Sequence, residues 1–291
     1  MVPLCQAARV EIWGADRVGE LTALAEAAMP AEALNADELM ACCWDDPSIV
    51  LGTADGSGAI CASLRHEGAD GEITSAAVKL VAVHPGSRRV GIGGTLLGEL
   101  EAWAWDQGAP RITLGAAVPF YLWPGVDVRA LAMSCLAESR GYRDLGVALN
   151  MSVPSTFRAP VPDGLDVDRV LEDADVEAVE RFVGREWPEW SPETAVGLAQ
   201  GTCFAAFDPE RRAVGFACHS VNRAGWFGPT GTDPSHRGVG IGHALLAEVC
   251  RDVMVAGYGD VEISWIGPMR FYAAAGGSVS RVFRMLHKPR P

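Results

Sequence analysis

Two glycine-rich segments carry the residues of this chain that are best suited to binding a ligand. Residues 86–97 have the sequence GSRRVGIGGTLL and residues 235–246 have the sequence SHRGVGIGHALL, with seven of twelve positions identical. The offset of 149 positions between them still holds at Pro119 and Pro268. A register that is unbroken over more than thirty residues indicates one structural unit used twice. Each copy contains the motif Arg-x-x-Gly-x-Gly.

Each copy of the motif predicts a phosphate-binding loop between a strand and a helix. Glycines let the backbone approach a ligand closely, and apolar residues at helical spacing follow in 96–107 and 245–256. The first N–H groups of such a helix have no intrahelical partners, so they attract an anion together with the helix dipole. Arg88 and Arg237 can add a charged contact. The residues predicted to bind the ligand are Val83, Arg88, Arg89, Gly91, Ile92, Gly93 and Gly94 in the first copy, and Thr232, Arg237, Gly238, Val239, Gly240, Ile241 and Gly242 in the second.

Other glycine-rich phosphate loops fit these segments less well. A P-loop requires GxxxxGK[ST], and neither copy contains the lysine. A dinucleotide-binding turn requires GxGxxG, and both copies lack the third glycine. The remaining alternative is a strand-to-helix turn whose glycines serve only tight packing.

At these residues the chain resembles the GNAT superfamily of acyl-CoA-dependent N-acetyltransferases. The signature of that family is (Arg/Gln)-x-x-Gly-x-(Gly/Ala) between the fourth strand and the third helix, and both copies match it. Phe271-Tyr272, followed by Gly276, matches the aromatic pair that the family has near its last strand. The resemblance covers both halves of the chain. It implies a tandem GNAT protein that uses acetyl-CoA as co-substrate and holds its diphosphate on the loop amides.

The resemblance also implies that Tyr272 is catalytic, because in the family this tyrosine commonly protonates the departing thiolate. The acetyl group passes directly to the amine in a ternary complex, so the protein supplies positioning rather than a nucleophile. A packed helix aromatic is the alternative for Tyr272. In the first half, Phe120-Tyr121 directly follows a strand, and a longer stretch leads to Gly141. The second half is expected to carry the chemistry because Tyr272 and the strand with two glycines and a proline lie there, although both halves could bind acyl-CoA.

The strands before the two loops differ in sequence. Residues 78–83 predict a smooth apolar strand, whereas residues 226–232 contain two glycines and a proline, which are typical of a bulge or a bend. The resemblance implies that a bulge here frees backbone amides near the acetyl carbonyl; a plain broken strand is the alternative. Neither strand contains an acid. Asp233, Glu262 and His219 lie nearby, and the general base stays unassigned between them and a water relay.

The composition predicts a folded chain without a metal site or a membrane span. The chain has 291 residues, of which 49% are hydrophobic and 21% are charged. Its eight cysteines show neither CxxC nor Cys/His metal spacing, which is typical of a reduced, cytoplasmic protein. The net charge of −13 argues against nucleic-acid binding and suits a cationic amine. No apolar run approaches the roughly 18 residues of a membrane helix, and no signal peptide is predicted.

The two halves repeat one order of elements, which predicts a mixed α/β sheet in each half. Predicted strands of the first half lie at 9–13, 49–53, 59–64, 78–83, 111–116 and 147–153, and helices at 16–29, 35–43, 96–107 and 128–140. Predicted strands of the second half lie at 165–170, 203–207, 214–221, 226–232, 261–265 and 279–286, and helices at 173–183, 191–200, 245–256 and 269–275. Proline-rich residues 154–164 predict a linker between GNAT domains at 1–153 and 165–291.

Together these features predict an N-acetyltransferase that moves an acetyl group from acetyl-CoA to a primary amine of a small molecule. The alternatives are a non-catalytic acyl-CoA-binding or sensing protein and a protein N-acetyltransferase. We expect a monomer or a homodimer with neither a nucleic-acid nor a membrane partner. The acceptor itself cannot be predicted, because its pocket is built from loops and helices without a shared motif.

Overall fold

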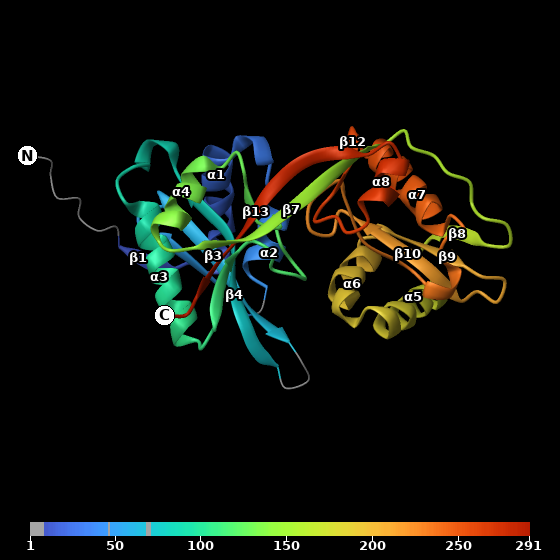
Figure 1. Cartoon of the computed structure of the whole chain (residues 1–291), viewed down its shortest axis with the longest axis horizontal. Helices are drawn as coiled ribbons and strands as arrows, with labels where there is room; N and C mark the ends of the chain where they lie inside the picture. The colour runs from blue at the N-terminus through green and yellow to red at the C-terminus, as the bar shows by residue number, and fades with distance from the viewer. Residues whose placement is uncertain (1–8, 46, 68–70) are drawn as a thin grey trace, which may run out of the picture. The chain divides into compact units, whose positions relative to one another are not determined.

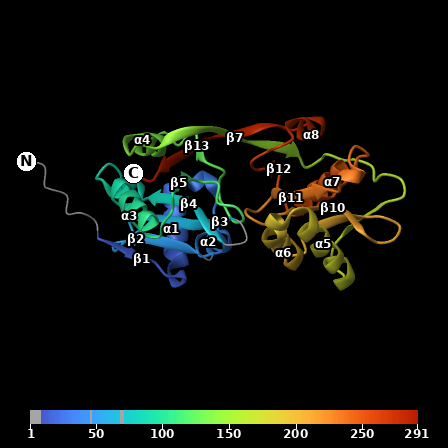
Figure 2. The same ribbon diagram turned by 60° about the horizontal axis from the view of Figure 1, so that its bottom comes forward.

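The computed structural model describes residues 9–45, 47–67 and 71–291, which form two compact units. Unit 1 contains the chain up to Ala148 together with Phe283–Pro291, and unit 2 contains Leu149–Val282. Strands and helices are mixed in both units, as Figures 1 and 2 show. The predicted α/β class is therefore confirmed.

Unit 1 is a mixed sheet with helices on both faces. Its strands follow the order β1-β2-β3-β4-β5-β13, in which β4 and β5 are parallel and the other neighbours are antiparallel. The strands are β1 (Val10–Ile12), β2 (Ser48–Thr53), β3 (Gly58–Glu67), β4 (Glu72–Val83), β5 (Arg111–Leu114), the short β6 (Val126–Asp127) and the end of β13 (Ser278–Pro289). The helices are α1 (Val18–Ala28), α2 (Ala36–Cys43), α3 (Ile92–Asp106) and α4 (Leu131–Ser139).

Unit 2 repeats this arrangement. Its strands follow the order β8-β9-β10-β11-β12-β7, with β11 and β12 parallel. The strands are β8 (Asp166–Arg169), β9 (Cys203–Phe207), β10 (Ala213–His219), β11 (Trp226–Thr232), β12 (Asp260–Ile263) and the end of β7 (Arg143–Pro154). The helices are α5 (Asp173–Glu186), α6 (Ser191–Ala199), α7 (Ile241–Val255) and α8 (Met269–Ala274).

The last strand of each half pairs with a strand of the other half. The end of β13 lies against β5, with Leu286 opposite Leu114, and the end of β7 lies against β12, with Met151 opposite Ile263. The two units consequently meet in sequence within β7 and β13, whereas the sequence suggested a division around 154–164. An apolar alternation predicts a strand but not its partner, because both edges of a strand carry N–H and C=O groups that can pair.

Apolar side chains fill both faces of the sheet in unit 1. Ile60 belongs to the cluster under α3, with Leu96 and Leu100, whereas Cys61 belongs to the cluster under α1 and α2, with Leu21. Successive strand residues point to opposite faces, so the predicted hairpin serves two cores at once.

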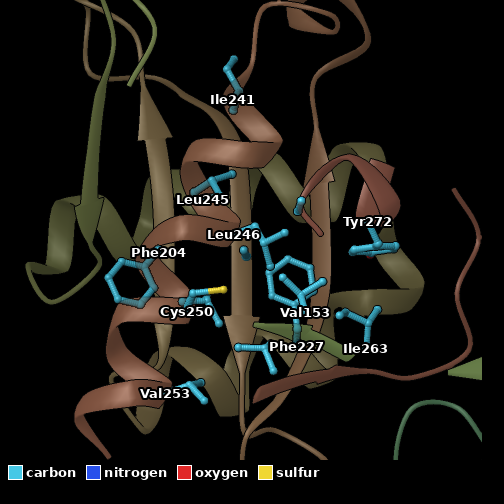
Figure 3. Packing of buried hydrophobic residues seen from close by; sticks show 14 of the residues in the cluster. Val153, Phe204, Phe227, Ile241, Leu245, Leu246, Cys250, Val253, Ile263 and Tyr272 are labelled. Atoms are coloured by element: carbon cyan, nitrogen blue, oxygen red, sulfur yellow. The ribbon is translucent and has the colours of Figure 1, made fainter. Parts of the chain in front are cut away.

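In unit 2 the two faces of the sheet are equally distinct. Leu245, Leu246 and Ile263 belong to the cluster that packs α7 on one face, as Figure 3 shows. On the other face the rings of Phe182 and Trp187 pack around Phe216 of β10. The face of the sheet on which a side chain lies therefore limits which other side chains it can contact at the site.

Candidate active site

The two predicted loops have the same local hydrogen bonds. Each loop begins with one 3₁₀ turn, Pro85–Ser87 in unit 1 and Pro234–His236 in unit 2. A side chain caps each turn by accepting from the backbone N–H two residues later: His84 Nδ1 does so at 3.2 Å and Asp233 Oδ1 at 2.8 Å. His84 and Asp233 are also 149 positions apart, so the repeat extends to the caps of the turns.

The backbone conformation leaves the first turns of α3 and α7 open to an anion. Gly91 and Gly240 are the N-cap residues, with φ angles of 95° and 103°, a region that favours glycine. Two residues earlier, Arg89 and Gly238 also have positive φ angles, 66° and 84°. Neither N-cap supplies a side-chain hydrogen bond, and neither first turn contains an acid. The N–H groups at both helix starts therefore fit a diphosphate.

The two arginines fasten the loops to the strands that precede them. Arg88 donates from Nε to the carbonyl of Val83 at 3.1 Å and from Nη2 to that of Ala28 at 2.9 Å. Arg237 donates from Nε to the carbonyl of Thr232 at 3.2 Å. Both arginines are exposed, and a contact from their other N–H groups to phosphate stays a prediction. The hydrogen bonds present give the arginines a role in loop geometry that the sequence did not suggest.

The second glycine of each loop makes room for a helix. A Cβ on Gly242 would lie 3.0 Å from the ring of Phe271, and a Cβ on Gly93 would lie 3.4 Å from Leu136. Gly94 is close to Leu136 as well, at 4.0 Å. Leu136 of α4 and Phe271 of α8 therefore occupy equivalent places on the two loop helices. Close helix packing explains these glycines in addition to the predicted approach to the ligand.

The isoleucines of the two motifs anchor the loop helices to the sheet. A Cβ on Gly58 would lie 2.6 Å from Ile92 Cγ2, and a Cβ on Gly215 would lie 2.8 Å from Ile241 Cγ2. Both glycines lie on hairpin strands far from the motifs in sequence, and their role was missed. Val239, by contrast, is 58% exposed. Its side chain is not part of the core, so its contribution to a ligand site stays a prediction.

The parallel strands in front of each loop separate after a short paired stretch. In unit 2, Trp226 pairs with Glu262 and Phe227 pairs with Ile263. Beyond this point β11 continues to Thr232, while β12 has ended. In unit 1, β4 and β5 pair at the positions that correspond through the offset of 149, and β4 likewise continues to the loop. Each unit thus presents a strand edge that leads from the point of separation to the loop.

Both of these strands are bulged. The register between β10 and β11 shifts at Gly228-Pro229, as the sequence predicted. The register between β3 and β4 shifts at Lys79, so the prediction of a smooth first strand is wrong. Lys79 and Gly228 are 149 positions apart. An apolar run conceals a bulge because one extra residue leaves its neighbours apolar, and the bend therefore does not distinguish the two halves.

The bulge residue of unit 1 is held by a buried ion pair. Lys79 donates from Nζ to Asp45 Oδ1 at 2.6 Å and to the carbonyl of Cys42 at 2.8 Å, and its side chain is fully buried. Burial raises the pKa of the Asp45 carboxyl, and the Lys79 ammonium opposes that rise. The Lys79 ammonium is thus paired in the interior of unit 1 and is not exposed to solvent.

Tyr272 has no counterpart in unit 1. Helices α4 and α8 are followed by Gly141 and Gly276, which have φ angles of 84° and 82° and are 135 positions apart. Leu136 and Phe271, which pack on the two loop helices, are also 135 positions apart. This spacing is 14 positions shorter than the offset of the loops because unit 1 has 14 more residues between its loop and the end of α4. At this spacing Tyr272 corresponds to Ala137, which is buried. Helix α4 therefore has no hydroxyl group at the position of Tyr272.

Tyr272 lies next to the point where β11 and β12 separate. Its ring contacts that of Phe227 edge to face, with centroids 6.2 Å apart, and that of Phe271, at 4.9 Å. Figure 3 shows Tyr272, Phe227 and Ile263 together at this end of the core. The ring is only 5% exposed. The structure therefore brings the predicted catalytic tyrosine to the end of the paired strands.

Two of the three acids and bases near the loop have structural roles. Asp233 caps the 3₁₀ turn, and the hydrogen bonds from Ser235 lower the pKa of its carboxyl. His219 Nε2 lies 2.8 Å from Asp252 Oδ2, and burial lowers the pKa of the imidazole. Asp252 also pairs with Arg169 and lies roughly 16 Å along α7 from the first turn of that helix. Asp233 is therefore engaged by the turn and His219 by Asp252, which gives both groups a structural role.

Glu262 lies beside the point of strand separation. It is half-buried in β12, opposite Trp226. Asn150 Nδ2 donates to Glu262 Oε1 at 2.9 Å, and Ser280 Oγ donates to the same oxygen at 3.0 Å. Asn150 Oδ1 in turn accepts from the backbone N–H of Trp265 at 3.0 Å. The carboxylate is therefore fixed in position by side chains from β7 and β13.

The remaining sequence predictions concern metals and membranes. Within residues 9–45, 47–67 and 71–291, no three His, Cys, Asp or Glu side chains are grouped so that they could hold a metal ion. No helix in the same ranges has both the length and the apolar character to cross a bilayer. The cysteines of the described residues are free thiols, and Cys5 lies outside those residues.

Both units have the GNAT fold, with one loop of this kind in each. Residues 18–122 match the acetyltransferase (GNAT) family. This segment, which lies in unit 1, therefore contains a domain of that family.

Individual relatives agree with this class. The chain is 31% identical over 220 residues to the mycothiol acetyltransferase of Geodermatophilus obscurus, and the match covers 67% of this chain and 66% of that protein. A tandem GNAT protein from the clavulanic acid biosynthesis pathway has a TM-score of 0.72 at 17% identity, covering 97% of this chain and 99% of the other. A GCN5-related N-acetyltransferase from Sphaerobacter thermophilus has a TM-score of 0.69 at 20% identity, covering 98% and 97%. These two structures share the fold over both units.

Proposed function

We propose that this chain is an N-acetyltransferase that transfers the acetyl group of acetyl-CoA directly to a primary amine of a small molecule, and that unit 2 performs the chemistry. The observation that carries the proposal is the place of Tyr272. It contacts Phe227 where β11 and β12 separate, while unit 1 has Ala137 at the equivalent position.

The residues of unit 2 fit acetyl-CoA. The N–H groups at the start of α7, behind Gly240, would hold its diphosphate, and the free edge of β11 leads from there to Tyr272. When bound, the co-substrate supplies an acetyl thioester. Tyr272 holds a hydroxyl proton at the end of that edge and can donate it to a departing sulfur.

The N–H groups behind Gly91 in unit 1 fit a diphosphate equally well. Unit 1 has alanine in place of the tyrosine, which supports a role in binding acyl-CoA without turnover. Under this proposal unit 2 is the enzyme and unit 1 is a non-catalytic acyl-CoA-binding domain. Two of the functions that the sequence left open are thus both present, one in each half.

A small cationic amine is the proposed acceptor. The net charge of −13 favours the approach of a cation, and the relative from Geodermatophilus obscurus is named as an acetyltransferase of mycothiol. We therefore include an amino form of mycothiol among the amines to be tested, beside diamines, amino sugars and lysine peptides.

The test is incubation of the full chain with acetyl-CoA and this amine panel, with mass spectrometry of the acetylated product as the readout. We expect a product with at least one small amine and none without enzyme. If only the peptides are acetylated, the acceptor is a protein and the proposed small-molecule acceptor is wrong. Binding of coenzyme A with no product from any amine would refute the enzyme.

A further inference from the structure

Tyr272 and Glu262 lie on opposite faces of the same two strands. Phe227 and Ile263, the last pair between β11 and β12, belong to the cluster under α7, and Tyr272 belongs to it too. Side chains alternate along a strand, so the preceding pair, Trp226 and Glu262, points to the other face. An acidic group and a phenol therefore flank the end of the paired strands.

We infer that Glu262 is the general base that takes the proton from the acceptor amine, while Tyr272 protonates sulfur from the opposite face. This inference rests on the proposed function. As the amine nitrogen bonds to the acetyl carbon and the carbon–sulfur bond breaks, the nitrogen gives one proton to the carboxylate. The sulfur gains one proton from the phenol. Both side chains regain their starting state by exchanging a proton with water, so protons and charge balance.

The hydrogen bonds of Glu262 suit a base that must be held in place. Asn150 and Ser280 both donate to Oε1. We assign the acceptance of the proton to Oε2, the oxygen to which neither of these two side chains donates. Asn150 is fully buried, so the orientation of the carboxylate is fixed from the interior.

The electrostatic surroundings bring this carboxyl closer to neutrality than an exposed glutamate. Burial raises the pKa of Glu262, and the hydrogen bonds from Asn150 and Ser280 and the charges of Arg281 and Arg223 offset part of the rise. A base works best when its pKa approaches the working pH, so this direction favours proton transfer.

Unit 1 again lacks the group. Thr113 of β5 occupies the position of Glu262, 149 residues earlier, and pairs with Ala77 as Glu262 pairs with Trp226. The acid and the base are therefore both confined to unit 2.

The test compares Glu262→Gln with Asp260→Asn, an acid two residues earlier on the same face of β12 that accepts from Ser152. We expect Glu262→Gln to lower kcat about 100-fold or more, to remove the acidic limb of the kcat/KM profile and to leave coenzyme affinity unchanged. Asp260→Asn should leave kcat unchanged. An unaltered kcat and pH profile for Glu262→Gln would overturn the inference.

Stability separates a base from a structural carboxylate. The raised pKa means that the folded state binds a proton more tightly than the unfolded state, so this carboxylate costs stability as the pH rises through its pKa. Glu262→Gln should thus keep or raise Tm at pH 8 and lose that gain at pH 4. A lower Tm together with lower kcat would indicate a structural role instead.

Ser280→Ala provides a second route, because Ser280 is exposed and its loss leaves the core intact. Removal of one donor to Oε1 should move the acidic limb of kcat/KM to higher pH without lowering the plateau. An unmoved limb would count against Glu262. Failure of wild type to acetylate any amine would instead refute the proposed function, so the two failures are distinguishable.

Discussion

The two units of this chain share a ligand loop and differ in the groups that could do chemistry. Gly91 and Gly240 begin their helices with nearly equal φ angles. By contrast, unit 2 has Tyr272 and Glu262 where unit 1 has Ala137 and Thr113. Under the proposed function, the loop motif marks where the co-substrate binds, and single side chains elsewhere on the fold decide which unit performs the chemistry.

The bulged strands sharpen this contrast. Both units bend the strand that leads to the loop, with Gly228 in unit 2 and Lys79 in unit 1 at the equivalent position. Glycine leaves the space beside the backbone free. Lys79 is instead tied to Asp45, so the same bend carries an internal anchor in the unit that lacks the tyrosine.

The largest expected effect is that of Tyr272→Phe. Loss of the proton donor should lower kcat by about 100-fold or more while coenzyme affinity is retained, because the ring packing remains. Tyr142→Phe is the matched control, since it removes a hydroxyl from a buried tyrosine of unit 1. Steady-state kinetics and calorimetry measure both variants. Equal kcat for the two variants would remove the distinction between the units.

Asp45→Ala should weaken unit 1 without touching catalysis. It leaves the Lys79 ammonium buried without its carboxylate, which costs about 3 kcal/mol of unfolding free energy. Glu177→Gln, which breaks the exposed pair with Arg181, should cost less than about 1 kcal/mol. Chemical denaturation gives the two values. Similar losses of unfolding free energy in the two variants would mean that the Lys79–Asp45 pair stabilises the fold no more than an exposed ion pair does.

Smaller effects are expected from the loop arginines. Arg88→Ala removes two hydrogen bonds to backbone carbonyls and Arg237→Ala removes one. Loss of these hydrogen bonds should destabilise the binding conformation of each loop by about 1 kcal/mol, so the affinity of that loop for coenzyme A should fall roughly fivefold. Calorimetry with coenzyme A would detect this at each unit. A loss of 100-fold or more would instead indicate direct contact between the guanidinium and phosphate.

The smallest effect concerns His219 and the pH dependence of stability. Burial lowers the pKa of this imidazole, so the unfolded chain binds a proton more readily than the folded chain. The unfolding free energy should therefore fall as the pH drops through 6.5 and below. His219→Gln should make this fall shallower and leave kcat unchanged, with His236→Gln as the control at a much less buried histidine. A steep loss of kcat would reinstate His219 as a candidate base.

The local features of the fold could be predicted from the sequence, because they depend on neighbouring residues. The loops, their helices and the hairpins follow from glycine positions and apolar spacing, and the bulge at Gly228 follows from its glycine and proline. The pairing of β13 with β5 could not be predicted, since a strand pattern does not name its partner. Nor could the packing of Gly242 on Phe271, which depends on contacts distant in sequence. Glu262 was recognised only as a nearby acid, because its face of the sheet depends on the register with Trp226.

The central claim, that the loop of unit 2 serves the chemistry, is tested most directly by comparing acetyl transfer in Gly240→Val and Gly91→Val. Both positions have φ angles that a β-branched residue resists, and neither added Cβ would meet an atom closer than 3.8 Å. The two substitutions therefore disturb each loop backbone alike. We predict that kcat/KM for acetyl-CoA falls about 100-fold or more in Gly240→Val and stays within a few-fold of wild type in Gly91→Val. Equal losses, or a larger loss in Gly91→Val, would contradict this account.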